Sequence, residues 1–286
     1  MFRYERPTGL AETLALMKDT TDARLLCGGT DLLVGLRKGT ITTPLVIDIK
    51  GVAELEAGVE EVDGALRIGA TTPLTRISAD PRIRATFPAL VEGMNVVGSI
   101  QIRNRATLAG NVCNASPAAD TAPPLLVYDA VIELAGTSGR RRVPLVDFFV
   151  GPGTTVMEPG ELVSALELPL PGRPLGSSFE RMTRRRGVDL ATVNVACSVS
   201  STGVTTFGYG AVGPRPFRVV DASGALADPA LDPSTRESAL RRLAASATPI
   251  SNVRASAEYR REMLFVLSRR ALDAALQRLA EATHAG

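Results

Sequence analysis

The chain has 286 residues, 45% of them hydrophobic, which is enough for about two globular domains with cores of their own. Its 32 basic and 30 acidic residues leave a formal charge of +2, and no basic run is long enough to form a groove for nucleic acid. No apolar run reaches the roughly 18 residues of a membrane span, and the first residues lack the apolar segment of a signal peptide, so we expect a cytoplasmic globular protein.

The first part of the chain alternates helix and strand signals. Apolar residues with helical spacing predict a helix over residues 10–17, capped by Thr8. Buried strands are expected at residues 23–27 and 45–49, with a short helix between them that stops at Gly39. The pair Asp63-Gly64 predicts a hairpin between strands at 59–62 and 65–70, and Pro73 starts the helix that follows.

Residues 94–120 have the composition of a loop, but the segment is long for a loop without a function. Near its end, Ser116 and Pro117 are a typical N-cap and first helical residue, so we expect a helix with Asp120 about one turn inside it. Strands are expected at residues 131–134 and 142–146.

A Pro- and Gly-rich stretch at residues 169–174 predicts a domain boundary, which we place between residues 172 and 173. Beyond it, strands are expected at residues 178–183, 192–200 and 204–212, the last two joined as an antiparallel hairpin by Ser201-Thr202-Gly203. Helices are expected at residues 234–245 and 256–282. The second domain, 173–286, is therefore a smaller α+β unit in which helices pack on an antiparallel sheet.

Cysteine and histidine are sparse. Cys27, Cys113 and Cys197 form no C-x-x-C pair, so we expect no zinc or iron–sulfur site in this chain. The single histidine, His284, lies near the C-terminal end, which makes a catalytic triad, a histidyl base or a histidine-linked flavin hard to build. Any redox chemistry would then depend on a non-covalent cofactor.

Two segments combine small residues with polar side chains. In the first, a strand runs into Gly28-Gly29 and then a helix, so backbone N–H groups and the helix N-terminus can face a phosphate. The alternative is a tight strand-to-helix turn with Thr30 as the N-cap. In the second segment, residues 104–120, the small residues Ala106, Ala109 and Gly110 allow close backbone approach. Polar side chains that can bond phosphate or ribose are offered by Thr107, Asn111 and Ser116, and a carboxylate suited to sugar hydroxyls or an amino group by Asp120. Its alternative is a Gly/Asn-rich surface loop.

Both segments resemble the FAD-binding subunits of the xanthine dehydrogenase and carbon monoxide dehydrogenase family. The family patterns are G-G-T-D/S-L-L and I-R-N-x-A-T-x-G-G-N-I-x-x-A-S-P-x-x-D, and the second is matched by residues 102–120 except that Ala109 replaces its first glycine. That methyl group fits unless the position needs a positive φ. Further matches follow in the family's order at residues 4–8, 70–72, 184–191 and 252–261.

The resemblance implies an α+β fold with a vanillyl-alcohol-oxidase (PCMH)-type FAD-binding domain, 1–172, and a C-terminal domain of the carbon monoxide dehydrogenase flavoprotein type, 173–286. It places Asp120 at the adenosine side of FAD, Val97 at an apolar contact, Arg181 near the isoalloxazine ring, and Leu162 or Val163 beside that ring. The remaining cofactor contacts that it implies are Leu25, Leu26, Cys27, Gly28, Gly29, Thr30, Asp31, Leu32, Ala70, Thr71, Ala106, Thr107, Ala109, Gly110, Asn111 and Ser116.

In function, the resemblance implies an electron-transfer subunit with non-covalent FAD and no catalytic residues of its own. Its partners would be a large molybdopterin-binding subunit and a small subunit with [2Fe–2S] clusters, in a dimer of heterotrimers. The organic substrate and the final acceptor, whether NAD, a quinone or oxygen, stay open. The alternatives are a free-standing FAD-dependent oxidoreductase of the same fold and a nucleotide-binding scaffold. The cluster Arg184-Arg185-Arg186 is either a solvated turn or an anion contact.

Overall fold

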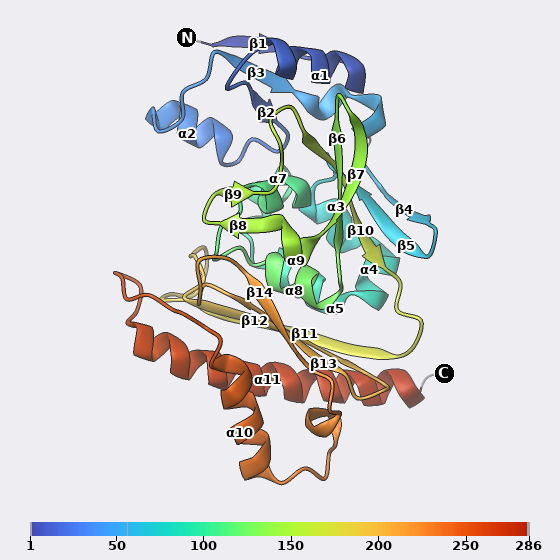
Figure 1. Ribbon diagram of the computed structural model, residues 1–286, viewed down its shortest axis with the longest axis vertical. Helices are drawn as coiled ribbons and strands as arrows, with labels where there is room; N and C mark the ends of the chain where they lie inside the picture. Colours follow the sequence, from blue (N-terminus) through green and yellow to red (C-terminus); the bar gives the residue numbers. More distant parts are fainter. Residues whose placement is uncertain (1, 56, 285–286) are drawn as a thin grey trace.

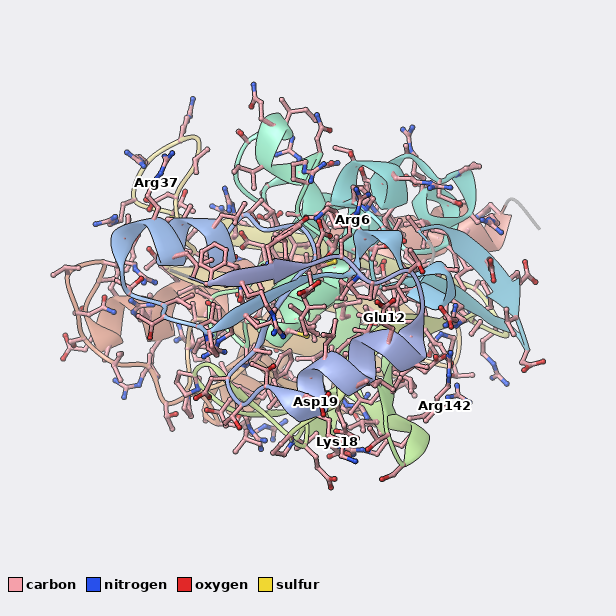
Figure 2. All side chains as sticks on the ribbon, turned by 90° about the horizontal axis from the view of Figure 1, so that it is seen from above. Arg6, Glu12, Lys18, Asp19, Arg37 and Arg142 are labelled. Carbon is pink, nitrogen blue, oxygen red and sulfur yellow. The ribbon has the colours of Figure 1, made fainter. Side chains whose placement is uncertain are left out.

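A small parallel sheet forms one end of the molecule. The computed structural model describes residues 2–55 and 57–284, and Figure 1 shows this sheet beside the N-terminus. Its strand order is β1-β3-β2, and Leu14 of the connecting helix packs on Leu45 and Ile47 of the central strand. Glu12, Lys18 and Asp19 of the same helix point outward to solvent (Figure 2). The elements are β1 (Arg3–Glu5), α1 (Leu10–Asp19), β2 (Arg24–Leu26), α2 (Leu32–Lys38) and β3 (Leu45–Asp48).

The middle layer is a five-stranded antiparallel sheet of order β4-β5-β10-β6-β7. Its strands are β4 (Val59–Val62), β5 (Ala65–Gly69), β6 (Val131–Gly136), β7 (Gly139–Pro144) and β10 (Leu162–Pro169). Short helices cover one face, and all of them except the one at residues 100–103 contribute buried side chains to the largest hydrophobic core. They are α3 (Leu74–Ala79), α4 (Pro81–Thr86), α5 (Pro88–Asn95), α6 (Ile100–Arg103), α7 (Leu108–Cys113), α8 (Ala122–Val127) and α9 (Leu145–Phe148), followed by the hairpin of β8 (Phe149–Gly151) and β9 (Thr154–Thr155).

The C-terminal layer is a four-stranded antiparallel sheet of order β11-β12-β13-β14, packed between the middle layer and the long helix α11 (Figure 1). Alternate residues of β12 face opposite ways, as a strand requires. Val193 and Val195 pack in the core with α11, whereas Asn194 bonds to the middle layer. The elements are β11 (Leu175–Met182), β12 (Val193–Ser200), β13 (Thr205–Gly210), β14 (Phe217–Asp221), α10 (Pro233–Ala244) and α11 (Ala257–His284).

Most of the predicted elements are present. The Asp63-Gly64 turn has positive φ at both residues and joins β4 to β5, and α2 ends at Gly39 in the left-handed conformation. The predicted C-terminal hairpin is β12 and β13. Five strands had no sequence prediction: the short strands β1, β8 and β9, β10 in the middle sheet, and β14 at the edge of the last sheet. Among the described residues no helix is long and apolar enough to cross a membrane.

Several local predictions were wrong. Gly9, not Thr8, is the N-cap of α1; the Thr8 backbone N–H instead donates to Glu12. Residues 94–120 are not one loop, because they hold two short helices, α6 and α7, capped by Ser99 and Thr107. Helices of one or two turns show too little periodicity to be read from sequence.

No helix starts at Pro117. Helix α8 begins at Ala122, and Asp120 precedes it. The reason lies in the C-terminal layer. The Pro117 carbonyl accepts a hydrogen bond from Ala211 N–H, and the Ala119 carbonyl accepts one from the Asn194 side-chain amide. Carbonyls that would start a helix are therefore bound by the C-terminal layer. The second predicted strand after this segment also ends early, since β7 stops at Pro144 and α9 follows.

Candidate functional site

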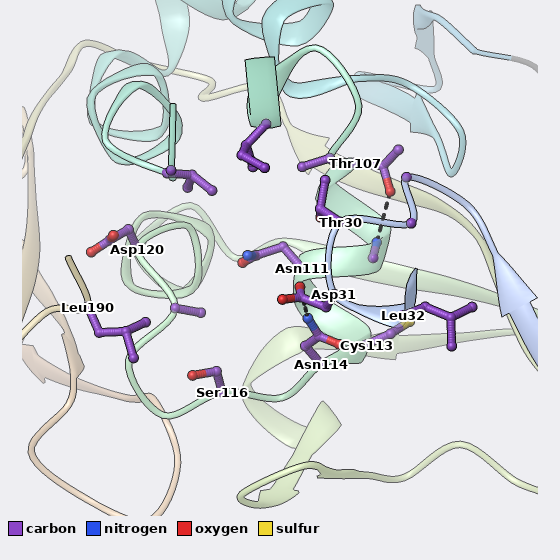
Figure 3. A pocket seen from close by; sticks show the side chains of 18 of the residues that line it. Thr30, Asp31, Leu32, Thr107, Asn111, Cys113, Asn114, Ser116, Asp120 and Leu190 are labelled. Atoms are coloured by element: carbon purple, nitrogen blue, oxygen red, sulfur yellow. Dashed lines mark hydrogen bonds between the residues drawn. The ribbon is translucent and has the colours of Figure 1, made fainter. Parts of the chain in front are cut away.

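A pocket of about 620 Å³ lies where the two glycine-containing segments meet the C-terminal layer. This volume is in the usual range for small-molecule and cofactor sites. Figure 3 shows Thr30, Thr107 and Leu32 on one side of it, Asp120 and Leu190 on the other, and Asn111 between them. The pocket thus joins three stretches of chain that are far apart in sequence.

The first wall is the turn from β2 into α2. Gly28 packs directly on the next wall, since a Cβ there would lie 2.4 Å from the Arg105 carbonyl oxygen. Gly29 has φ +77°, a conformation that favours glycine. The Gly29 carbonyl accepts from Leu33 N–H, so the turn leads straight into the helix. The structure therefore explains why both positions are glycine, and together the two residues bring the backbone to the edge of the pocket.

The second wall is α7 with the residues before and after it. Thr107 caps this helix, its hydroxyl accepting from Gly110 N–H at 3.1 Å. Ala109 lies within helix α7 and does not have a positive φ, so its methyl group fits without strain. Asn111 accepts a hydrogen bond from the Thr121 hydroxyl at 2.6 Å. The polar side chains of this wall are thus held in place by the helix and by the segment that follows it.

Two contacts join these walls. The Cys27 thiol lies 3.3 Å from the Thr107 hydroxyl and donates to the Ala70 carbonyl at 3.3 Å. At the other end, Asn114 donates to Asp31 at 2.6 Å (Figure 3). Burial raises the pKa of the Cys27 thiol, so this group is a neutral packing and hydrogen-bonding residue rather than a thiolate.

The third wall comes from the C-terminal layer. The loop after β11 contributes Arg185, Val188, Asp189 and Leu190 to the pocket. It is held by bonds from Arg185 to the Val188 carbonyl and by the ion pair of Arg184 with Asp189. Val188 and Leu190 are 54% and 53% exposed, so the loop presents apolar surface beside the polar walls. Together with Val97 and Ile102, which also line the pocket, this loop gives the pocket an apolar part.

Asp120 closes one end of the pocket and is only 7% exposed. Arg181 donates to one carboxylate oxygen at 2.7 Å and Asn194 to the other at 2.9 Å. Burial raises the pKa of Asp120, and the nearby charge of Arg181 with the bonds from Asn194 and Arg181 opposes that rise. Asp120 and Arg181 thus form one ion pair, although the family resemblance assigns them to different parts of FAD.

The structure brings most of the predicted site residues to the pocket. Those lining it are Leu25, Cys27, Gly28, Gly29, Thr30, Asp31, Leu32, Val97, Ala106, Thr107, Gly110, Asn111, Ser116 and Asp120. The others support it from behind or lie elsewhere: Leu26, Ala70 and Ala109 are buried, Thr71 donates to the Leu55 carbonyl, and Arg181 pairs with Asp120.

Leu162 and Val163 are the clear departure. Both lie in β10, at the centre of the middle sheet, with side chains buried in hydrophobic cores, and neither lines the pocket. The strand that holds them was not predicted, so nothing in the sequence showed that their side chains are used in packing. Conversely, the lining residues that were not predicted as cofactor contacts are Gly98, Ile102, Cys113, Asn114, Ala118, Ala119, Arg185, Val188, Asp189 and Leu190.

The residues present suit a dinucleotide with a flat ring. Glycine turns allow phosphate groups to approach backbone N–H groups, hydroxyl and amide side chains can bond phosphate or sugar, and the apolar part can cover a ring face. His284 is the exposed last residue of α11 and is not part of the pocket lining. The described residues contain no group of His, Cys, Asp and Glu side chains that could hold a metal ion.

Comparison with known proteins agrees with this geometry. Residues 1–171 match the family model of the FAD binding domain in molybdopterin dehydrogenase, and residues 177–275 match the carbon monoxide dehydrogenase flavoprotein C-terminal domain. The xanthine dehydrogenase FAD-binding subunit of Escherichia coli O157:H7 is 31% identical, over 96% of this chain and 95% of that protein. The carbon monoxide dehydrogenase medium chain of Afipia carboxidovorans is 31% identical, over 97% of each chain.

The solved structures give the same result. In carbon monoxide dehydrogenase from Hydrogenophaga pseudoflava, one chain superposes with a TM-score of 0.90 at 29% identity, covering 97% of this chain and 98% of that one. The similarity therefore extends over both the middle and the C-terminal layers, including every wall of the pocket.

Proposed function

Because the chain belongs to the family of FAD-binding medium subunits of xanthine dehydrogenase and carbon monoxide dehydrogenase, we propose that it is the electron-transfer subunit of a molybdenum hydroxylase. It is an oxidoreductase flavoprotein subunit with an α+β FAD-binding domain followed by a C-terminal α+β domain. The observation that carries the proposal is the pocket itself, in which two glycine-containing walls and a loop of the second domain surround one cofactor-sized space.

We assign the walls to parts of the cofactor by their chemistry. The turn at Gly28 and Gly29 and the start of α7 would hold the pyrophosphate through backbone N–H groups. Asp120 would accept hydrogen bonds from an O–H or N–H group of FAD, and Val188 and Leu190 would cover an apolar face. FAD, when bound, supplies the capacity to take up and release electrons; the chain supplies binding, orientation and exclusion of water.

The source and the destination of the electrons lie outside this chain. We propose that electrons arrive from [2Fe–2S] clusters of a small subunit, after substrate oxidation at the molybdopterin site of a large subunit, and leave to an external acceptor. The medium-chain names of the relatives support a multi-subunit complex, and the assembly we propose is a dimer of heterotrimers in the cytoplasm. The domain boundary that we propose, between residues 172 and 173, falls in the connection between β10 and β11.

Activity with and without partners tests this proposal. We expect the isolated chain to catalyse at most slow transfer to artificial acceptors such as dichlorophenolindophenol. Copurified with the molybdenum and iron–sulfur subunits, it should support oxidation of an organic substrate or a small molecule. Rapid oxidation of an organic substrate by the isolated chain would instead identify a free-standing FAD-dependent oxidoreductase, and a chain without affinity for FAD would identify a nucleotide-binding scaffold.

A further inference from the structure

Asn194 is a buried amide on a strand of the C-terminal layer whose bonds all run toward the cofactor pocket. It lies between Val193 and Val195 and is 0% exposed. Its Nδ2 group donates to the Asp120 carboxylate at 2.9 Å and to the Ala119 carbonyl at 3.2 Å. Both donors of the amide are therefore used on the segment that closes the pocket.

The other end of the same amide has no hydrogen-bond partner. Asn194 Oδ1 is buried and unpaired among the described residues, and it faces Gly210 on the neighbouring strand. A Cβ at Gly210 would lie 2.1 Å from this oxygen, so the glycine makes room for the amide. A buried acceptor without a partner lowers the stability of the fold, so stability alone does not explain why this position holds an asparagine.

Arg181 completes the arrangement from the adjacent strand. Its guanidinium donates to the second oxygen of Asp120 at 2.7 Å and also reaches the Gly187 carbonyl at 3.5 Å. In the sheet register Arg181 is paired with Asn194, so neighbouring residues of β11 and β12 each bind one oxygen of a single carboxylate. This geometry fixes the plane of the carboxylate, and each oxygen keeps a lone pair for another donor.

We infer that Asn194 and Arg181 are positioning residues of the cofactor site, which hold the Asp120 carboxylate so that it can accept hydrogen bonds from FAD. The inference rests on the proposed function, because it takes FAD as the ligand of this pocket. It goes further in assigning part of the cofactor affinity to two residues of the second domain, neither of which lines the pocket.

The charges around Asp120 give the inference a pH signature. Arg181 faces the carboxylate from β11 and Asn194 from β12, while Arg185 and Asp189 of the loop after β11 line the same pocket. Burial raises the pKa of Asp120, and the charge of Arg181 is the largest influence that opposes this. Without Arg181 the carboxyl should protonate at a higher pH, and a protonated carboxyl is a weaker acceptor for FAD.

The test is to titrate the full chain with FAD at several pH values and to monitor binding by the quenching of flavin fluorescence. We expect Asn194→Ala and Arg181→Gln each to weaken FAD binding about tenfold near neutral pH. In Arg181→Gln the loss of affinity on acidification should begin at a higher pH than in the wild type. Arg181→Lys, which keeps the charge, should restore most of the affinity and the wild-type profile.

Two matched controls separate positioning from general damage to the contact between layers. Ser198→Ala removes a buried bond from the same strand to the Val127 carbonyl, and Arg278→Gln removes an ion pair with Glu92 between the layers; both should change FAD affinity less than threefold. If Asn194→Ala and Arg181→Gln behave like these controls, the inference is wrong and the proposed function stands. If the wild-type chain has no affinity for FAD, the proposed function fails, and the inference with it.

Discussion

At the scale of single residues, the pocket depends on a glycine that touches backbone. Gly28 is so close to the Arg105 carbonyl and to Ala106 that no side chain fits. The contact sets the spacing between the first two walls, and the Cys27–Thr107 contact beside it adds to the same junction. A change of one methyl group here should therefore alter the cofactor site more than it alters the rest of the fold.

We predict that Gly28→Ala weakens FAD binding by more than tenfold and destabilises the chain by about 2 kcal/mol, the usual effect of overpacking. Gly172→Ala is the matched control, since a Cβ there meets nothing within 4 Å. FAD titration and urea unfolding measure the two effects. An alanine variant with wild-type affinity would show that this turn does not shape the cofactor site.

At the scale of elements, the middle sheet is fastened across its strands by charged side chains. The Glu133 carboxylate on β6 accepts from Arg67 on β5 at 3.1 Å and from Ser164 on β10 at 2.6 Å, and it pairs with Arg140 on β7. Burial opposes ionisation of Glu133, but these hydrogen bonds and charges outweigh it and lower its pKa to about 2. One carboxylate thus links four neighbouring strands.

A carboxyl with a depressed folded-state pKa stabilises the fold above its unfolded pKa and loses that contribution as the pH falls. For Glu133 the loss should run from about pH 4.5, its ordinary pKa, to about pH 2. We predict that Glu133→Gln costs about 2 kcal/mol at pH 7, and that this difference from the wild type shrinks as the pH falls from about 4.5 to about 2. Urea unfolding at several pH values measures it; a difference that does not vary with pH would refute the assignment.

How far the sequence predicts these elements depends on how local their causes are. The β4–β5 hairpin and the Gly28-Gly29 turn follow from residues adjacent in sequence, and both were predicted. The start of α8 was not, because the Pro117 and Ala119 carbonyls are bound by a sheet that lies far along the chain.

The same reason separates the site residues that were predicted from those that were not. The motif at residues 184–191 was recognised, but its place as a pocket wall depends on how the two layers dock. The sequence does hold one signal for Asn194, which is a polar residue between two valines in a predicted strand. Leu162 and Val163 were assigned to the site by the family resemblance alone, and their own spacing does not show that they lie in a strand at the centre of a sheet.

At the scale of the whole molecule, the middle and C-terminal layers are joined too closely to behave as separate units. Gly208 of β13 packs on Pro123 of α8, where a Cβ would lie 2.3 Å from the Pro123 carbonyl oxygen. Tyr128 and Ser177 share a buried hydrogen bond, and Arg278 of α11 pairs with Glu92 of α5. The third wall of the pocket therefore keeps its position relative to the first two.

We predict one cooperative thermal transition for the whole chain, with the same midpoint by circular dichroism and by tyrosine fluorescence. Gly208→Ala should lower that midpoint by several degrees and weaken FAD binding at the same time, because it pushes the layers apart. Gly224→Ala, with open space around its Cβ but a positive φ, serves as a control for backbone strain alone. Two separate transitions in the wild type would contradict a rigid pocket shared by both layers.

The central claim is that the pocket between the two layers binds FAD without a covalent bond, and one measurement tests it most directly. The chain, freed of flavin, is titrated with FAD, then precipitated in acid, and flavin is measured in the supernatant and the pellet. We predict saturable binding of a single FAD per chain, weakened more than tenfold in Gly28→Ala, with all flavin in the acid supernatant. Flavin that stays with the polypeptide, or a chain that does not bind FAD either alone or with its partner subunits, would contradict the claim.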